Sequence, residues 1–424
     1  MIGSANDNHK IIQPIISTFA SVRGSMIILL LFLVEVLLGQ SPCATMEKTE
    51  NALSVDSAYK SSMIEQVDLL EQFESGVVDV ANRNVKQVTL PVVVHVLYES
   101  EEQNIPVEQI HSQIDVLNRD FGWNQSDKQK IPSIWRDLGR DSGIRFKLAD
   151  VDPDGNFTTG ITRKQIFQSD IGNGDSYYQS NLGGADPWPR PHYINIWICE
   201  IGENVLGYTF LPAASFPVND GIVIDPRALG SKGAAVEPYN GGRTLVHEIG
   251  HYLGLRHTWG MEEGECTNTD YMSDTPWQRE PNFGCSRFPH VSCASEPDGD
   301  MFMNFMDYAD DTCALLFTKR QVEFMQLVLQ TSREGLIHSP AITHTDEVDN
   351  YKLRVYPNPV DSRLFVNGLQ KGISQYDLFT NTGLLIRSSR ISNSNNQVSF
   401  ESLPNGIYLL RIESEVYRIV HLIQ

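Results

Sequence analysis

The positions of apolar residues predict a strand, a helix and further short strands in the middle of the chain. The run VTLPVVVHVLYE, which begins at Val88, is apolar or alternating as in a β-strand. After Pro106, apolar residues recur at helical spacing, at Val107, Ile110, Ile114, Leu117 and Phe121. Similar runs predict strands within residues 144–148, 193–199 and 221–225. Together these elements indicate a mixed α/β domain with a central sheet, over about residues 88–335.

The C-terminal region has a different pattern. The polar stretch SPAITHTDEVDN has no periodicity and predicts a linker over residues 336–351. Short alternating runs broken by turn residues follow it: LRVYPNP, RLFVNG, QYDLFTNTG, LLIRS, VSFESLPNG, IYLLRIES and YRIVHLI. They predict a small all-β sandwich domain over residues 352–424. This domain lacks a cluster of catalytic residue types in its sequence, so we expect it to bind, anchor or address the protein.

The N-terminal region contains one strongly apolar segment, Met26–Gly39. A membrane-spanning helix needs roughly 20 apolar residues, and this segment is shorter and contains Glu35. Arg23 precedes it and small residues follow it, which is typical of a signal peptide within residues 1–44. A short buried core helix is the alternative, and Met26 rather than Met1 could be the start of translation.

Residues 45–87 are polar and acidic and contain one amphipathic stretch, 64–73. This pattern predicts a pro-segment between the signal peptide and the α/β domain. No stretch of the mature chain is expected to span a membrane.

Composition and charge narrow the class of protein. The chain has 424 residues, of which 41% are hydrophobic and 20% charged, and this excludes a disordered or collagen-like protein. Lys and Arg total 33 against 53 Asp and Glu, which gives a net charge of −20. This charge argues against a nucleic-acid partner, because phosphate binding requires concentrated positive charge. It is compatible with calcium, which binds carboxylates.

Four of the six cysteines lie close together, at Cys266, Cys285, Cys293 and Cys313. In an exported protein such a cluster predicts disulfides. A structural zinc site is the alternative, but the paired C-x-x-C spacing of such sites is missing from this cluster. Cys43 falls where signal cleavage is expected, and Cys199 lies in an apolar run that predicts a buried, unreactive thiol.

The candidate chemistry lies in the segment TLVHEIGHYLGLRHTW. His247 and His251 are four residues apart, so on a helix they project from one face and can share a metal ion. Glu248 can then reach a metal-bound water. Gly254 allows a left-handed turn that brings His257 back to the metal. Three imidazoles with one open position are typical of catalytic rather than structural zinc.

The extended pattern HExxHxxGxxH is far more restrictive than two histidines on a helix. Downstream, NFMDY places Met306 in a polar turn, as a metzincin Met-turn requires. The alternative, histidines that meet by chance around a satisfied core, explains neither the glycine nor the methionine. The motif therefore predicts a zinc hydrolase.

With these motifs the chain resembles the pappalysin-type metzincins, secreted zinc endopeptidases, and their ulilysin-like members in particular. The resemblance covers most of residues 88–333 and is carried in order by GITR, INIWIC, LGYTFLP, GRTLVHEIGHYLGLRHTW, DYMSDTP, NFGC and NFMDYADDTC. It implies a metzincin-like catalytic domain, in which a twisted mixed sheet supports the helix of the zinc site.

The resemblance also implies roles for single residues. The zinc ligands would be His247, His251 and His257, with Glu248 as general base and acid. Met306 would lie beneath the metal, and Tyr308 would assist at the tetrahedral intermediate. The family pairs its cysteines alternately, which implies Cys266 with Cys293 and Cys285 with Cys313.

Calcium, latency and substrate binding follow less directly. Ulilysin-like enzymes bind calcium in the loop where this chain has Asp270, Asp274 and Thr275, all oxygen donors; a solvated acidic loop is the alternative. Many metzincins hold a pro-segment cysteine on zinc, yet Cys43, the only upstream cysteine, falls in the region expected to leave with the signal peptide. The strand in LGYTF is a candidate edge for an extended substrate peptide.

The C-terminal module resembles the type A sorting domain of the Por (type IX) secretion system of Bacteroidetes. VYPNPV, YDLFTNTG and LPNGIYLLRI carry this resemblance over about residues 353–424. It implies a Gram-negative source, passage through the outer-membrane secretion machinery, and a secreted or cell-surface location. A carbohydrate-binding or adhesion sandwich is the rival, and the lack of clustered aromatic residues in the sequence argues against it.

The sequence thus predicts a secreted zinc endopeptidase that acts on proteins or peptides through a metal-activated water and a glutamate base. The alternative is a catalytically silent surface adhesion protein that retains the fold. The presence of Glu248 argues against this alternative.

Overall fold

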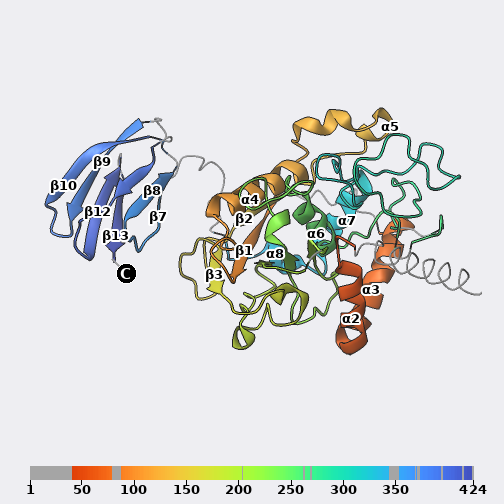
Figure 1. Cartoon of the computed structure of the whole chain (residues 1–424), viewed down its shortest axis with the longest axis horizontal. Helices are drawn as coiled ribbons and strands as arrows, with labels where there is room; N and C mark the ends of the chain where they lie inside the picture. Colours follow the sequence, from red (N-terminus) through yellow and green to blue (C-terminus); the bar gives the residue numbers. More distant parts are fainter. Residues whose placement is uncertain are drawn as a thin grey trace, which may run out of the picture. The chain divides into compact units, whose positions relative to one another are not determined.

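The structure is a computed structural model, and it divides into two compact units, Met1–Ile342 and Thr343–Gln424 (Figure 1). The residues it describes are 41–78, 87–202, 204–260, 263–267, 270–342, 353–367, 369, 373–392, 395–412 and 415–422. The predicted signal-peptide core, Met26–Gly39, and most of the predicted linker lie outside these residues.

The first unit is built on a mixed sheet whose neighbours follow the order β2-β1-β4-β6-β5, with β3 also paired to β1. Its strands are β1 (Val88–Tyr98), β2 (Ile144–Leu148), β3 (Ile161–Gln165), β4 (Ile194–Ile198), β5 (Gly207–Tyr208) and β6 (Ile222–Ile224). All pairs are parallel except β5 with β6. The predicted α/β fold with a central sheet is confirmed, and β1 is a continuous apolar run because it is buried on both faces.

Helices cover this sheet and position the site. They are α4 (Val107–Phe121), α5 (Ser133–Arg136), α6 (Arg243–Tyr252), α7 (Lys319–Gln330) and α8 (Glu334–Ile337). Short 3₁₀ helices lie at Ser126–Lys130, Ile171–Asn173, Ser180–Leu182 and Pro226–Ala228. Helix α6 is buried along nearly its whole length, in the same apolar core as β1, β4 and α7. A helix inside the core holds its side chains rigidly, which suits a site that must be preorganised.

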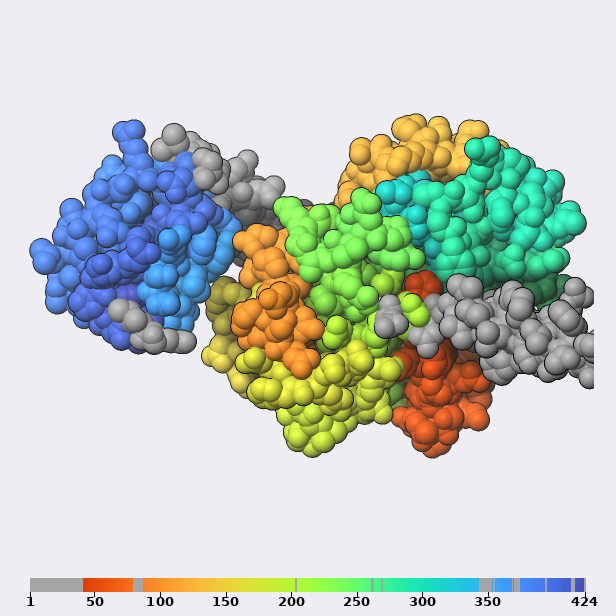
Figure 2. Space-filling model, viewed as in Figure 1, coloured from red at the N-terminus to blue at the C-terminus, as the bar shows by residue number. Residues whose placement is uncertain are grey.

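The region predicted as a pro-segment contains two helices, α2 (Thr45–Val55) and α3 (Ser57–Glu74), which lie at the surface of the unit, in red in Figure 2. Helix α3 includes the predicted amphipathic stretch and is capped by Asp56, which accepts hydrogen bonds from the first-turn amides. Phe73 is fully buried, with its ring 5.2 Å from that of Phe324 and the Arg320 guanidinium 3.8 Å above it. Helix α3 is therefore anchored in the core of the unit.

The second unit is all β. Its strands are β7 (Arg354–Tyr356), β8 (Arg363–Asn367), β9 (Ile373–Thr380), β10 (Leu385–Ser392), β11 (Gln397–Ser399), β12 (Gly406–Ile412) and β13 (Glu415–His421). They form two antiparallel sheets, β10-β9-β12-β13 and β11-β8-β7, around a separate apolar core. This agrees with the predicted sandwich. Among the described residues, none of the helices combines the length and apolar character needed to cross a bilayer.

The first unit extends to Ile342, beyond the expected start of the linker at residue 336. Leu336 and Ala341 are buried, and the Ala341 carbonyl accepts a hydrogen bond from the Asp150 amide. The sequence pattern missed this packing because apolar residues are sparse in this polar stretch.

His95 in β1 should make the first unit acid-sensitive. Its ring is buried between Thr162 and Asn195, at 2.8 and 3.1 Å, and packs against two tryptophans. Burial lowers the pKa of His95 from 6.5 to about 4. Because the unfolded chain binds the proton more readily, stability should be full above pH 6.5 and fall as the pH drops towards 4. The loss should reach about 3 kcal/mol, at about 1.4 kcal/mol per pH unit.

Urea unfolding at pH 7.5 and 4.5 measures this effect. The difference between the two pH values should be smaller in His95→Gln than in the wild type, because glutamine does not titrate. Equal differences in the two proteins would contradict the assignment to His95.

Candidate active site

Helix α6 carries His247, Glu248 and His251, and Gly250 in the same helix allows Met306 to pack closely against it. A Cβ atom at Gly250 would overlap the sulfur of Met306, which lies directly against the helix. Helix α6 ends before Gly254, whose φ of +95° turns the chain away. A side chain at Gly254 would also meet the Phe324 ring at 2.9 Å. The turn that follows brings His257 to the two histidines of the helix.

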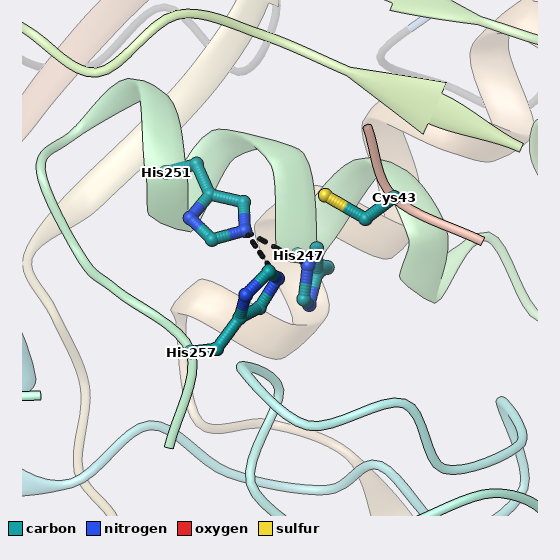
Figure 3. A group of neighbouring side chains, drawn as sticks. All are labelled: Cys43, His247, His251 and His257. Atoms are coloured by element: carbon teal, nitrogen blue, oxygen red, sulfur yellow. Dashed lines mark hydrogen bonds between the residues drawn. The ribbon is translucent and has the colours of Figure 1, made fainter. Parts of the chain in front are cut away.

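The three histidines converge through their Nε2 atoms (Figure 3). Nε2 of His251 lies 3.0 Å from Nε2 of His247 and 3.0 Å from Nε2 of His257. The opposite ring nitrogens bond to the backbone. Nδ1 of His247 donates to the Phe305 carbonyl at 2.7 Å, and Nδ1 of His251 donates to the Leu255 carbonyl at 2.8 Å. These bonds fix the tautomers, so that Nε2 of both rings carries a lone pair.

Burial keeps the rings neutral. It lowers the pKa of His247 to about 4, and burial and the neighbouring rings lower the pKa values of His251 and His257 well below that of a free imidazole. Lone pairs that face one another at this distance repel unless a cation lies between them. Three imidazole nitrogens around a tetrahedral zinc ion would lie about 3.3 Å apart, so the residues fit a divalent metal.

Glu248 lies beside this cluster and is completely buried. Its Oε2 accepts a hydrogen bond from the Thr45 hydroxyl at 2.8 Å, whereas its Oε1 has no partner among the described protein atoms. Burial raises the pKa of Glu248 to about 7, although the bonds from Thr45 and Cys43 oppose the shift. A carboxylate with a pKa near neutrality can both accept and return a proton at physiological pH.

The turn after Asn304 supplies Met306 and Tyr308. Asp307 is buried and accepts hydrogen bonds from the amides of Asn282 and Tyr308, which fixes the turn. The Tyr308 hydroxyl lies 3.1 Å from Nε2 of His257. The structure therefore brings Tyr308 to the histidine cluster and places Met306 against Gly250 of helix α6.

Cys43 is the site residue that sequence reasoning missed. The ligand atoms of Cys43, His247, His251 and His257 all lie within 4.8 Å of one another, and among the described residues they form the group able to hold a metal ion (Figure 3). Cys43 pairs in parallel with Gly207 of β5, so the strand edge carries it to the site. Its position in the sequence suggested loss with the signal peptide. The sequence signal available was that it is the only cysteine ahead of the α/β domain.

A pocket adjoins the cluster. Its lining includes His247 and Glu248, together with Leu206, Tyr239, Thr244 and Ala314. Residues of the N-terminal segment, Pro42 and Cys43, also line part of this pocket.

The other five cysteines and the predicted calcium residues lie outside the cluster. Disulfides join Cys266 to Cys293 and Cys285 to Cys313, the pairing that the resemblance implies, and Cys199 is free and buried. In the neighbouring loop, the Thr275 hydroxyl donates to Asp270, and Asp274 accepts from Thr318 and the Arg320 amide.

Comparisons with known proteins agree with this geometry. The model of peptidase family M43, described as pregnancy-associated plasma protein-A, matches residues 178–330. A structure of mirolysin in complex with compound 9 is 42% identical, covers 61% of this chain and 100% of its own, and superimposes with a TM-score of 0.58. The chain belongs to the pappalysin-type M43 metalloprotease family.

Other relatives extend the similarity. Mature mirolysin of Tannerella forsythia with a cleaved peptide is 43% identical over 60% of this chain and 96% of its own, with a TM-score of 0.56. A variant of Tannerella forsythia promirolysin is 38% identical over 70% and 97%, with a TM-score of 0.61. An extracellular metalloprotease of Arthroderma benhamiae is 27% identical over 262 residues, 60% of this chain and 76% of that protein.

The C-terminal module of this M43 metalloprotease also has a match. The secretion system C-terminal sorting domain matches residues 354–423, essentially the whole all-β unit. Together with the extracellular relatives, this makes the protein a secreted or cell-surface metalloprotease.

Proposed function

We propose that this protein is a zinc endopeptidase, made as a latent precursor, in which Glu248 is the general base. The observation that carries the proposal is the convergence of three neutral imidazoles, two of them with tautomers fixed by backbone carbonyls, beside a buried carboxylate. His247, His251 and His257 would hold the ion. This set is the three-histidine pattern of catalytic zinc, with a fourth position for the reaction.

When bound, the metal supplies a Lewis acid that polarises the scissile carbonyl and acidifies water. Glu248 then accepts the proton of the attacking water and delivers it to the nitrogen of the leaving amine. The Tyr308 hydroxyl, next to His257, can donate a hydrogen bond to the oxygen on which negative charge develops.

The edge of β5 would hold the substrate. β5 is the last strand of the sheet order and pairs only with β6 among the described strands. Its free edge now receives the N-terminal segment: the Leu206 amide donates to the Pro42 carbonyl at 2.8 Å, and the Ala44 amide donates to the Gly207 carbonyl at 3.1 Å. An extended substrate can make the same backbone bonds once this segment leaves.

The N-terminal segment would keep the precursor inactive. Burial and the charge of Glu248 raise the pKa of the Cys43 thiol, and a cation among the histidines would reverse this and favour the thiolate. Cys43 would then occupy the position that the reaction needs. This assignment places the start of the pro-segment before Cys43, earlier than residue 45.

The loop of Asp270, Asp274 and Thr275 remains our candidate for calcium. Burial, together with the charge of Asp274, raises the pKa of Asp270 to about 8. A dication held by both carboxylates would offset the effect of the Asp274 charge on Asp270. Metal analysis of the purified protein, with and without calcium in the buffer, tests the site.

Digestion of a denatured proteome, analysed by mass spectrometry, tests the proposed function. The matured protein should produce new peptide termini, and a zinc chelator should stop their formation. If none form, the silent adhesion protein becomes the better explanation. A preferred residue beside the cleaved bond would define the specificity.

Deletion of residues 352–424 should leave an active protease that is no longer released. The β module has its own core and contributes no residue to the histidine cluster, whereas its match is to a sorting domain. Fractionation of a Bacteroidetes host that expresses the full chain or the deletion measures the effect. Normal release of the shortened chain would contradict the sorting role, and failure of the shortened chain to fold would show that the module is structural.

A further inference from the structure

The N-terminal segment contacts more of the site than the histidines. The Ser41 hydroxyl donates to the Tyr308 hydroxyl at 2.6 Å, and the Cys43 thiol lies beside the histidine cluster. Thr45, the first residue of α2, contacts Glu248. Every second residue of the segment thus contacts a different part of the site. Ser41 contacts Tyr308, Cys43 lies beside the histidines, and Thr45 contacts Glu248.

The Thr45 hydroxyl makes two hydrogen bonds. It donates to Oε2 of Glu248 at 2.8 Å and accepts from the Thr209 amide, just after β5, at 2.9 Å. Thr45 is completely buried, so water cannot replace either partner without movement of the segment. A buried hydrogen bond to a carboxylate is stronger than one between neutral groups.

We propose that Thr45 is a second lock of the precursor, acting on the base rather than on the metal. Its hydroxyl holds Glu248 while the segment is docked, so that release of the Cys43 thiol removes only one of the two contacts that close the site. The inference rests on the proposed function, because it takes Glu248 as the base and the N-terminal segment as inhibitory. Thr45 would act by positioning Glu248 in the latent state and would take no part in the reaction itself.

Labelling of thiols in the intact precursor tests the proposal without an activity measurement. Cys43 can react with iodoacetamide only when the segment lifts from the site, whereas Cys199, the other free buried cysteine, reports unfolding of the domain. Mass spectrometry of the intact chain confirms that each labelled molecule still carries the segment. Thr45→Val removes the hydroxyl and keeps the shape of the side chain.

The matched control is Thr49→Val. Thr49 lies one turn further along α2, is buried, and accepts a hydrogen bond from the Leu211 amide at 3.3 Å, but it has no hydrogen bond to Glu248. Each substitution is made in the wild type and in Glu248→Ala. The effect of losing a contact with Glu248 should depend on this background, and the effect of losing contacts with other groups should not.

In the wild-type background, Thr45→Val should raise the labelling rate of Cys43 about tenfold or more, and Thr45→Ser should stay near the wild type. In Glu248→Ala, the effect of Thr45→Val should fall to about threefold or less, while that of Thr49→Val should be the same in both backgrounds. Labelling of Cys199 should not change. If Thr45→Val exposes Cys199, Thr45→Ala takes its place in the same comparison.

An equal effect of Thr45→Val in both backgrounds would overturn the proposal, because Thr45 would then only anchor the segment on Thr209. No effect in either background would overturn it as well. Labelling of wild-type Cys43 at the rate of the urea-unfolded chain would overturn the docking itself and the lock with it. Failure of the endopeptidase proposal is separate, since it would be seen as absent peptide hydrolysis by the matured enzyme.

Discussion

Replacement of Glu248 by glutamine should abolish peptide hydrolysis and leave the metal bound. The amide preserves the shape of the side chain but cannot accept the proton of water. Positioned proton transfer contributes about 10² to 10⁴ in rate, so we expect a loss at least this large. A fluorescent peptide assay on the matured protein, with metal analysis of the same sample, measures both quantities.

The comparison variant is His251→Ala, which should lose the metal and the activity together. His251 lies within 3.0 Å of both other imidazoles, so its removal breaks the cluster itself. Near-normal turnover by Glu248→Gln would show that another group is the base, and metal loss by this variant would show that Glu248 contributes to binding.

Replacement of Cys43 by alanine should convert the latent precursor into one that loses its own N-terminal segment. Removal of the thiol from the histidine cluster should raise the rate of this processing about a hundredfold, which corresponds to about 2.7 kcal/mol of docking energy. Intact-mass measurements over time after purification follow the reaction. The Thr45 contact should persist in this variant, so Cys43→Ala combined with Thr45→Val should be processed faster still.

Cys199→Ala is the matched control, because Cys199 is the other free buried cysteine and does not belong to the histidine cluster. It should stay latent. Processing of Cys43→Ala at the wild-type rate would mean that the thiol does not hold the site closed. Processing that also accelerates in Cys199→Ala would point to a general loosening of the domain.

The elements that could be predicted from the sequence are those whose side chains are apolar on a regular period. β1 and β4 are buried runs, and α4 has apolar residues on one face. β3 was not predicted, because ITRKQ is half exposed and mostly polar. Helix α2 was not predicted either: its buried residues, Thr45 and Thr49, are held by hydrogen bonds rather than by apolar packing.

Helix α7 was missed although a local signal exists. Thr318 and Gln321 form a capping box, in which each side chain bonds to the other's backbone, and apolar residues follow it. This pattern can be found in a sequence when threonine and glutamine three residues apart precede an apolar run.

The candidate site also contains residues that a regular period predicts and residues that it does not. His247, Glu248 and His251 were predicted because the helical period places them together, and the positions of Met306 and Tyr308 came from the resemblance. Cys43 could not be placed, because its contact with the histidines is made through the edge of β5, and a strand edge accepts any backbone. Contacts of this kind depend on tertiary structure and leave no spacing in the sequence.

In the proposed latent precursor, the covalent connection from α3, which ends at Glu74, to β1, which begins at Val88, would set the local concentration of the inhibitory segment. A tethered segment acts at an effective concentration of roughly millimolar, so a few contacts keep the cleft filled. One cut in this connection turns the segment into a free peptide at no more than the concentration of the enzyme. Dilution after secretion then favours dissociation of the cut segment, so activation would depend on the volume into which the enzyme is released.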